Sequence, residues 1–553
     1  MAGRLSRPGW PVVLLAIGVV VQLAPILLLP MVLTQDGPAH VDGAWVLLHH
    51  GDDDAVGAAL RTNYTVDLSP VPNLLTTLLL AGLLSVLGPD AAEKVVVAGF
   101  VLLLVAGLRF ALRGVDRRAG WLAVAALPLA GGQLVAYGFY NFCWGVALAL
   151  FVVGVALRRR EGWDVRRTVA VGLLLALTWS AHLLPWVGAV LLVGGLAAGR
   201  WVVAVRTGAR PWPAAAGHLL PPFLAVLPGV ALTVAYLSRG GGTHGVASGW
   251  SPGRLWQLVT LYRPLVVGSG WELVPSVAVA VVLACLAVAA VRRRGPDPVR
   301  APEAGALMAR ADRVVLGTAT VLAVAGFLLT PSRLGPEYGF LSDRLAWFPP
   351  LLLVLFCATR PPRREVLRRV AAVVLVLAAT TAALVRLPTQ LADQRQAAEL
   401  LSVADVLPAG TTFAVLRFAG HQAALAPLPG EPDPLRHLSS RLAVEVGGVD
   451  VGHYEAVYPY FQVRFSPDPG VRQAIDPGLD GLDAVPPWVH LPAAGDRLQY
   501  VLVVGLDQAE DWVRSAHRTA GVLADLRAAY VQVARSGPSG YVSVWRLRNA
   551  TDG

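Results

Sequence analysis

One short segment carries the acidic and basic side chains best placed for proton-transfer chemistry. It runs from Thr34 to Trp45 and directly follows a long apolar run. Asp36 therefore lies close to an apolar layer, where desolvation raises the pKa of a carboxylate toward that of a useful general base. Asp36 also precedes Pro38, a common residue of the first helical turn, so the same carboxylate could cap a helix. The two roles are compatible.

His40 lies four residues beyond Asp36, on the same face of the predicted helix. It could orient the carboxylate or bind an acceptor substrate, and an ordinary histidine at a hydrated helix end fits equally well. Further along, His49, His50 and the acidic run 52–54 suggest a divalent-cation site, but such a turn is more typical of a solvated loop. We therefore predict no resident metal and no cofactor, with a divalent cation as the alternative.

Two further groups of polar or aromatic residues interrupt the apolar runs. Tyr140 and Asn141 belong to the aromatic stretch 137–142, whose rings could stack on a sugar, although an aromatic belt at a membrane interface explains them without a ligand. His182 has apolar neighbours; it is either a functional group at membrane depth or a histidine satisfied by a neighbouring helix. No nucleotide-binding, zinc-protease or serine-hydrolase motif occurs in a plausible context.

Composition indicates what kind of protein positions these residues. The chain has 553 residues, of which 55% are hydrophobic and 15% charged, whereas a soluble protein has about 25% charged residues. Apolar runs such as 11–33, 95–112 and 370–387 approach the ~20 residues of a bilayer-spanning helix. The net charge of +10 comes from arginines in short loops, a topology signal rather than the basic face of a nucleic-acid binder. The sequence predicts a polytopic membrane protein without a nucleic-acid partner.

The arginine-rich loops predict an orientation. If all of them lie in the cytoplasm, the segment 71–87 must lie along the outer surface as a juxtamembrane helix, and about eleven spans remain. The amino terminus is then cytoplasmic, and the first outer loop, 34–92, and everything after about residue 388 lie outside. The expected spans are 11–33, 93–112, 120–138, 141–158, 168–183, 185–205, 217–237, 273–291, 313–331, 344–359 and 370–387.

The carboxyl-terminal part has a different composition, with more polar residues and turn signals. The stretch 500–504 predicts a buried strand, 507–530 a helix, and 530–534 with 541–547 a hairpin. We therefore expect a mainly α protein, in which a transmembrane helical bundle (residues 1–389) is followed by an extracytoplasmic α/β domain (residues 390–553).

This organisation resembles that of the GT-C glycosyltransferases, in particular the mannosyl- and aminoarabinose-transferase-like members. The shared features are a long first span, an Asp-containing loop that enters an amphipathic helix, a second juxtamembrane helix, many further spans and an outer domain after the last of them. The resemblance implies transfer of a sugar from a polyprenyl-phosphate carrier, with Asp36 near the reacting centre. Many members have two adjacent acids there, whereas Gly37 follows Asp36 here, and Asp42 is a candidate for the second carboxylate.

A polyprenyl-phosphate donor needs a cation for its departing phosphate. Charge builds up on that phosphate as the glycosidic bond breaks, and a fixed guanidinium can hold two of its oxygens. Arg61 in the first outer loop and Arg344 at the start of a span are candidates, and Arg333 and Glu337 share the short loop before Arg344. Arg344 could instead be a snorkelling anchor paired with Asp343.

We therefore predict a hexosyl- or pentosyltransferase of the plasma membrane and cell envelope. Its partners would be the lipid-linked donor, a glycan, lipid or protein acceptor, and membrane lipid. One rival is a transporter of lipid or glycan carriers, which should have ionisable residues near the middle of its spans, whereas charges here lie mainly at span ends. The other is a membrane scaffold with a cell-wall-facing domain, which should tolerate loss of Asp36.

Overall fold

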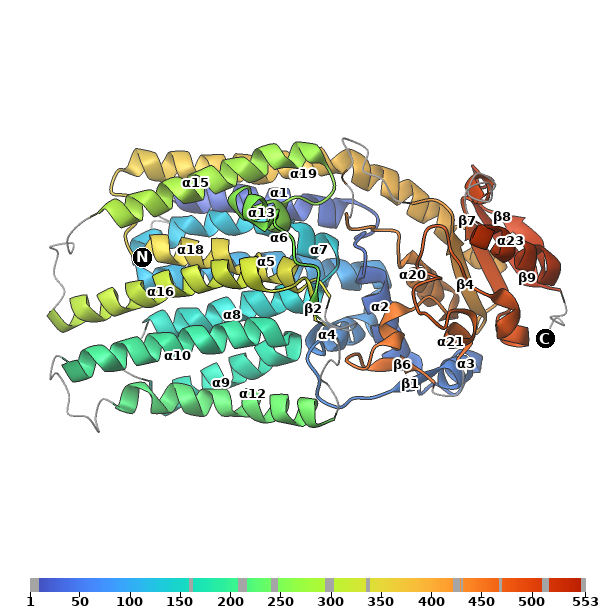
Figure 1. The fold of residues 1–553 in the computed structure, drawn as a ribbon, viewed down its shortest axis with the longest axis horizontal. Coiled ribbons are helices and arrows are strands. Elements are labelled where there is room, and N and C mark those ends of the chain that lie inside the picture. The colour runs from blue at the N-terminus through green and yellow to red at the C-terminus, as the bar shows by residue number, and fades with distance from the viewer. Residues whose placement is uncertain are drawn as a thin grey trace, which may run out of the picture.

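Long apolar helices form one part of the molecule, and a small α/β region lies at one end of them (Figure 1). The computed structural model describes residues 9–158, 163–206, 216–239, 247–293, 303–334, 339–420, 428, 431–466, 470–509 and 517–548. Among these residues, nine helices are long and apolar enough to cross a membrane. The chain is therefore a multi-pass membrane protein, and the expected fold class is confirmed.

The helices of the bundle share one continuous buried core of aliphatic and aromatic side chains. Each is built mainly from Leu, Val and Ala, and most charges lie in the last turns or the connecting loops. The helices are α1 (Trp10–Leu28), α5 (Pro89–Val115), α8 (Tyr140–Arg158), α9 (Val165–Ala181), α10 (Leu183–Arg206), α12 (Leu220–Ser238), α15 (Leu273–Arg292), α16 (Glu303–Leu329), α17 (Leu341–Leu345), α18 (Phe348–Ala358) and α19 (Glu365–Leu401).

One expected span is not a continuous helix. Residues 120–138 instead form parts of three short helices, η1 (Arg117–Ala126), α6 (Leu127–Ala130) and α7 (Gln133–Ala136). The glycine pair at 131 and 132 separates α6 from α7, because glycine is a poor helix former. α9 has 17 residues, at the short end of the range for a membrane-spanning helix. These two segments account for the difference between the eleven expected spans and the nine long apolar helices among the described residues.

Short elements connect the bundle helices. α4 (Leu75–Leu84) has ten residues, too few to span a bilayer, and packs against α2 (Gly37–His49), as expected of a juxtamembrane helix. The other connecting elements are α3 (Ala55–Asn63), β1 (Tyr64–Val66), η2 (Ala216–His218), β2 (Ala247–Ser248), α13 (Arg254–Val259), α14 (Tyr262–Leu265), η3 (Gly270–Glu272) and β3 (Arg333–Leu334).

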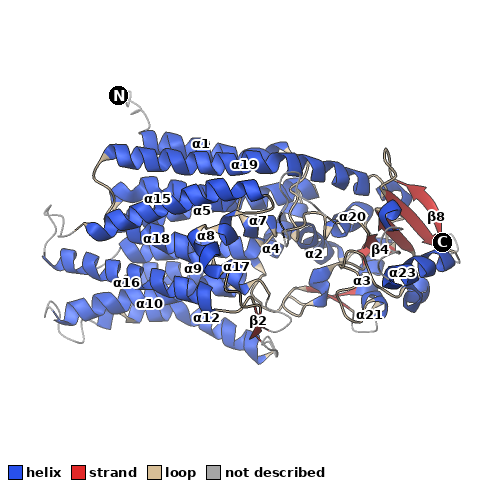
Figure 2. Ribbon diagram, turned by 45° about the horizontal axis from the view of Figure 1, so that its top comes forward, coloured by secondary structure: helices blue, strands red, loops and turns tan. Residues whose placement is uncertain are grey.

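A five-stranded mixed sheet organises the C-terminal α/β region, at the end of the molecule where Figure 2 shows most of the strands. Its order is β5 (Val449–Asp450), β4 (Thr412–Arg417), β7 (Tyr500–Val504), β9 (Val542–Leu547) and β8 (Tyr530–Arg535). The predicted strand and hairpin are confirmed; the predicted helix is present as α23 (His517–Ala529), and residues 510–516 lie outside the described residues. The remaining elements are η4 (Ala404–Val406), α20 (Leu438–Val446), η5 (Tyr454–Val457), β6 (Val463–Phe465), α21 (Val471–Ile475) and η6 (Leu491–Arg497).

The C-terminal region and the first loop after α1 are packed into each other. α19 runs without a break across residues 389 and 390, the expected domain boundary. β1 pairs antiparallel with β6, and α20 packs on α2. We call the contact between α2 and the segment His437–Phe461 the junction; Figure 1 shows it between the bundle and the sheet.

Candidate active site

Asp36 lies at the junction, where α2 begins. Its backbone N–H donates to the carbonyl of Tyr137 at 3.0 Å, which ties the loop to the end of α7. Asp36 occupies the N-cap position, but its carboxylate makes no capping hydrogen bond. The hydroxyl of Thr34 instead accepts from the N–H of Gly37 at 3.1 Å. The expected capping role therefore belongs to Thr34, and the carboxylate of Asp36 makes other contacts.

Those contacts come partly from the C-terminal region. Oδ1 of Asp36 accepts from the side-chain amide of Gln35 at 3.1 Å and lies 3.7 Å from Nε2 of His437. The hydroxyl of Tyr454 hydrogen-bonds the same carboxylate. Burial raises the pKa of Asp36 to about 6, although His40 and the hydrogen bonds favour the charged form. A carboxylate of this pKa is mostly ionised at neutral pH and can accept a proton.

His40, one turn along α2, is held between two acceptors. Its Nε2 donates to the carbonyl of Gly138 at 2.9 Å, and its Nδ1 forms an ion pair with Oε1 of Glu455. Burial would lower the pKa of His40, but Glu455 raises it to about 9. Burial would raise the pKa of Glu455, but His40 lowers it to about 2. The junction thus contains a buried cation beside the candidate base.

Asp42 extends this group of buried ionisable side chains. Its Oδ2 lies 3.4 Å from Nδ1 of His453, whose Nε2 lies 4.0 Å from Oε2 of Glu455. Burial raises the pKa of Asp42 to about 7. Asp42, His453, Glu455 and His40 therefore form a chain of charges along α2 that joins it to the C-terminal region. Asp42 belongs to this chain, whereas Asp36 hydrogen-bonds Gln35 and Tyr454 and is affected by His40 only electrostatically.

A second carboxylate reaches the start of α2 from α5. The hydroxyl of Tyr140 donates to Oε1 of Glu93 at 2.6 Å and contacts the hydroxyl of Thr34 at 2.8 Å. A Cβ added to Gly37 would lie 2.2 Å from Oε1 of Glu93 and 2.5 Å from the hydroxyl of Tyr140. The space that a side chain at position 37 would need is therefore occupied by Glu93, Tyr140 and Thr34, and a larger residue would have to displace them.

The turn between α7 and α8 requires glycine. Gly138 has φ +82°, and an added Cβ would lie 2.7 Å from the backbone nitrogen of Gly37 and 2.9 Å from that of Asp36. Only a glycine lets this turn approach the Asp36 loop and present its carbonyl to His40. Asn141, at the start of α8, accepts from the N–H of Thr76 and ties α4 to α8. Asn141 and Tyr140 thus have positioning contacts.

Arg344, in α17, approaches this site from the bundle. Its guanidinium lies over the ring of Phe139 at 4.6 Å, its Nη1 donates to the carbonyl of Gly339 at 3.0 Å, and it acts electrostatically on Asp36. Its Nε is buried and has no hydrogen-bond partner among the described residues. The alternative pairing with Asp343 is absent from this part of the chain, since Asp343 pairs with Arg263 at 2.9 Å.

The other predicted residues have different surroundings. Nδ1 of His182 accepts from the N–H of Leu184 at 3.1 Å, and its ring packs edge-on against Phe142. Arg333 is exposed in β3, and Glu337 lies outside the described residues. Arg61 donates to backbone carbonyls of residues 50 and 52 at the far end of α2, about 20 Å from Asp36 at 1.5 Å per helical residue.

Sequence inspection missed the residues that the C-terminal region contributes. They are His437, His453, Tyr454 and Glu455, together with Glu93 from α5. The stretch 453–461 holds a histidine, a glutamate and four aromatic residues within nine positions, a density typical of a site rather than of a surface loop. Glu93 is an acid at the start of an apolar run, which is also a signal for function.

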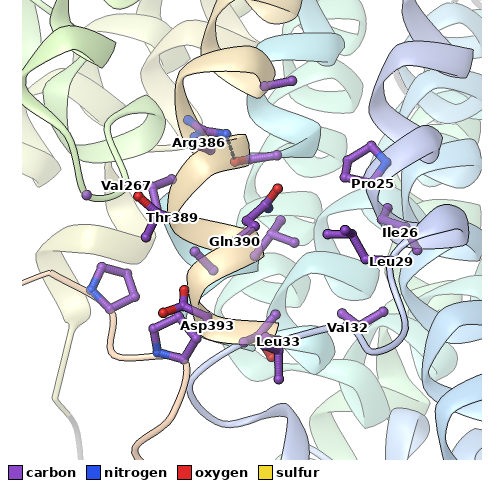
Figure 3. A pocket seen from close by; sticks show the side chains of 18 of the residues that line it. Pro25, Ile26, Leu29, Val32, Leu33, Val267, Arg386, Thr389, Gln390 and Asp393 are labelled. Atoms are coloured by element: carbon purple, nitrogen blue, oxygen red, sulfur yellow. Dashed lines mark hydrogen bonds between the residues drawn. The ribbon is translucent and has the colours of Figure 1, made fainter. Parts of the chain in front are cut away.

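A cavity of about 150 Å³ lies behind the Asp36 loop, between α1 and α19 (Figure 3). Pro25, Ile26 and Leu29 form an apolar wall, and Arg386 and Asp393 lie opposite. The guanidinium of Arg386 is already engaged by Glu272 and by the carbonyls of residues 131 and 265. Among the described residues, no group of three or more His, Cys, Asp or Glu side chains is arranged to hold a metal ion.

Fold and site together define a multi-pass membrane protein with a cluster of buried acidic and histidine side chains between its first loop and a C-terminal α/β region. The solved structure of ArnT from Cupriavidus metallidurans in the apo state is similar to this chain, with 14% sequence identity and a TM-score of 0.46 over 97% of each chain. No protein-family model matches the chain, and no curated protein matches it.

Proposed function

We propose that the protein is a membrane glycosyltransferase of the GT-C type that uses a polyprenyl-phosphate sugar as donor. The observation that carries the proposal is the carboxylate of Asp36, which is buried, makes no capping bond and has its pKa raised to about 6. It lies within electrostatic reach of Arg344, whose Nε has no hydrogen-bond partner among the described residues. A base and a phosphate-binding cation at one site are the two groups that this reaction needs.

In the proposed step, Asp36 removes the proton from an acceptor hydroxyl. The acceptor oxygen then forms a bond to the anomeric carbon of the sugar, and the bond between that carbon and the phosphate oxygen breaks. The electron pair leaves on the polyprenyl phosphate, whose growing negative charge is stabilised by Arg344. The guanidinium has a fixed stacking partner in Phe139, so little reorganisation is needed during the reaction.

The neighbouring residues would position the base. His40 is cationic and one helical turn from Asp36, so it favours the ionised carboxylate. Tyr454 and His437 bring the C-terminal region directly onto the carboxylate. We infer that the acceptor, a glycan, lipid or protein, enters between the first loop and this region. The division into residues 1–389 and 390–553 would then separate a donor-binding part from an acceptor-binding part.

The orientation follows from the arginine-rich loops. We propose that the junction lies on the outer face of the plasma membrane and that the amino terminus lies in the cytoplasm. A transporter receives less support. The buried charges of Arg200 and Asp312 already pair with each other at 2.7 Å, and they lie near the end of α10 that is remote from the junction. Arg200 also donates to the carbonyl of Ala156 at the end of α8, which is typical of a structural contact.

The direct test is sugar transfer by the purified protein in detergent. A radiolabelled polyprenyl-phosphate sugar and a lipid and glycan extract of the producing cell are supplied, and the label is followed into a product that no longer partitions with the donor. A transferase forms this product without a sealed membrane. A transporter or scaffold forms none, even with the full set of donors, and that result would overturn the proposal.

A further inference from the structure

A cavity lined by arginines lies at the end of the bundle remote from the junction. It has a volume of about 410 Å³ and is formed by the start of α1, the end of α5, η1 and the start of α19. In Figure 1 these chain segments meet at the end of the helices opposite to the C-terminal region. Its basic lining residues are Arg109, Arg113, Arg117, Arg118 and Arg368.

The charges around this cavity do not balance. Its acidic lining residue, Glu365, already pairs with Arg369 at 2.5 Å, and Arg369 is not part of the lining. None of the five lining arginines forms an ion pair with an acidic residue in the described part of the chain. Cations held this close repel one another unless a counter-ion is present. The arrangement therefore favours an anion in the cavity.

Two orphaned donors give an independent indication. The indole Nε1 of Trp121 is buried in a side chain that is only 4% exposed, and it has no hydrogen-bond partner among the described residues. Nε of Arg368 is buried and unpartnered in the same way. Both residues line the cavity. Buried N–H groups are nearly always paired, so an acceptor with several oxygens is the expected occupant.

Membrane topology alone does not explain these features. Arg166, Arg206 and Arg292 also lie at helix ends and are as exposed as Arg113, Arg117 and Arg118, but they do not line the cavity. Trp10 lines the cavity at the start of α1, and its ring is covered on one face by Arg369 at 5.8 Å. A tryptophan beside arginines at the start of a span is typical of the headgroup level of a bilayer.

We propose that this cavity binds a phosphate group, whose oxygens accept from the arginines and from the indole of Trp121. The phosphate of an anionic phospholipid headgroup in the adjacent leaflet is the expected source, and free inorganic phosphate shares the same chemistry. The site is separate from the proposed transfer reaction and does not depend on it.

The test uses the full-length protein in detergent, stripped of co-purified lipid. It is offered phosphatidylcholine alone, phosphatidylcholine with an equal part of phosphatidylglycerol, or phosphatidylcholine with inorganic phosphate at the same concentration. Native mass spectrometry reports retained lipid, and thermal unfolding reports stabilisation. The expected result is selective retention of phosphatidylglycerol, with about a hundredfold weaker binding by the triple variant Arg113→Gln, Arg117→Gln, Arg118→Gln.

Two further variants make the test specific. Trp121→Phe keeps the ring but removes the N–H donor, and we expect binding about fivefold weaker. The triple variant Arg166→Gln, Arg206→Gln, Arg292→Gln removes the same charge from the same end of the bundle and should bind normally. Stabilisation by inorganic phosphate alone would assign the site to a soluble phosphate. Equal retention by wild type and the cavity variant, or equal weakening by both triple variants, would overturn the proposal.

Discussion

The two ends of α2 contain the same residue types in opposite environments. At its start, Asp36 and His40 are buried, with 6% and 5% of their surface exposed, and their partners include Tyr454 and Glu455 from a region more than 400 residues away in sequence. At its end, His49 is partly exposed and Asp52 is exposed, and they pair with each other at 2.7 Å within one turn. An acid and a histidine thus become a candidate site only where another part of the fold covers them.

The C-terminal region therefore contributes to the electrostatics of the site. Burial raises the pKa of Asp36 to about 6, and Glu455 of the C-terminal region raises the pKa of His40 to about 9. The far end of α2 has ordinary local contacts, including the hydrogen bonds from Arg61 to the backbone. Matched substitutions at the two ends of one helix can therefore separate a functional environment from a merely polar one.

The largest expected effect on stability comes from the buried ion pair. Glu455→Gln leaves His40 without its counter-ion and should lower the free energy of unfolding by about 3–5 kcal/mol. Asp52→Asn breaks the exposed pair with His49 and should cost well under ~1 kcal/mol. Thermal or denaturant unfolding in detergent measures both. If both variants lose equally little free energy of unfolding, the ion pair between His40 and Glu455 does not stabilise the junction.

The same pair predicts a pH dependence. The pKa of His40 is raised from 6.5 to about 9, so its contribution is fully present below pH 6.5 and is lost as the pH rises through 9. The pKa of Glu455 is lowered from 4.5 to about 2, so its contribution is present above pH 4.5 and is lost as the pH falls through 2. The stability gap between wild type and Glu455→Gln should be widest from pH 4.5 to 6.5. A gap that widens toward pH 9 would contradict this assignment.

Two glycines of the same loop give a smaller, steric comparison. Gly37→Ala places a methyl group against Glu93 and Tyr140 and should destabilise the protein by about 1–3 kcal/mol. Gly51 has no atom within 4 Å of an added Cβ, so Gly51→Ala should leave stability nearly unchanged. Melting temperatures of the two variants check the prediction. An unchanged melting temperature for Gly37→Ala would show that the carboxylate of Glu93 is free to move away.

The smallest expected effect concerns the donor phosphate. Arg344→Lys keeps the charge but loses the planar group stacked on Phe139, so it should raise the KM for the lipid-linked donor more than that for the acceptor. Arg61→Lys, at the far end of α2, should change neither. Steady-state kinetics with each substrate varied in turn make the measurement. A larger change in the acceptor KM would assign Arg344 to the other substrate.

The sequence predicts the helices and strands better than it predicts the contacts between them. Long apolar runs and the short, continuously apolar stretch 500–504 are local patterns, and they give the bundle and the buried strand β7 correctly. Asp36 was found because it follows an apolar run. Its contacts with Tyr454 and His437 depend on the packing of distant segments, which no local pattern contains. The capping interpretation is wrong, because the N–H of Gly37 donates to the hydroxyl of Thr34 and the carboxylate of Asp36 makes no capping hydrogen bond.

Adjacent residues on a helix point in different directions, and this explains why Asp343 and Arg344 do not pair with each other. Asp343 and Arg344 are neighbours in sequence, yet Asp343 faces Arg263 of α14. Arg344 is thereby left with the ring of Phe139 and one backbone carbonyl. The sequence shows which charged residues are present near the membrane boundary, but only the three-dimensional structure shows which of them are already neutralised.

If Asp36 accepts a proton during sugar transfer, Asp36→Asn and Asp52→Asn should differ in activity. Both substitutions remove one carboxylate next to α2 and preserve shape. The transfer rate from a radiolabelled polyprenyl-phosphate sugar is measured for both purified, folded variants and for wild type. We expect Asp36→Asn to be slower by about 10²–10⁴-fold and Asp52→Asn to equal wild type. Equal rates for wild type and Asp36→Asn would contradict this role of Asp36.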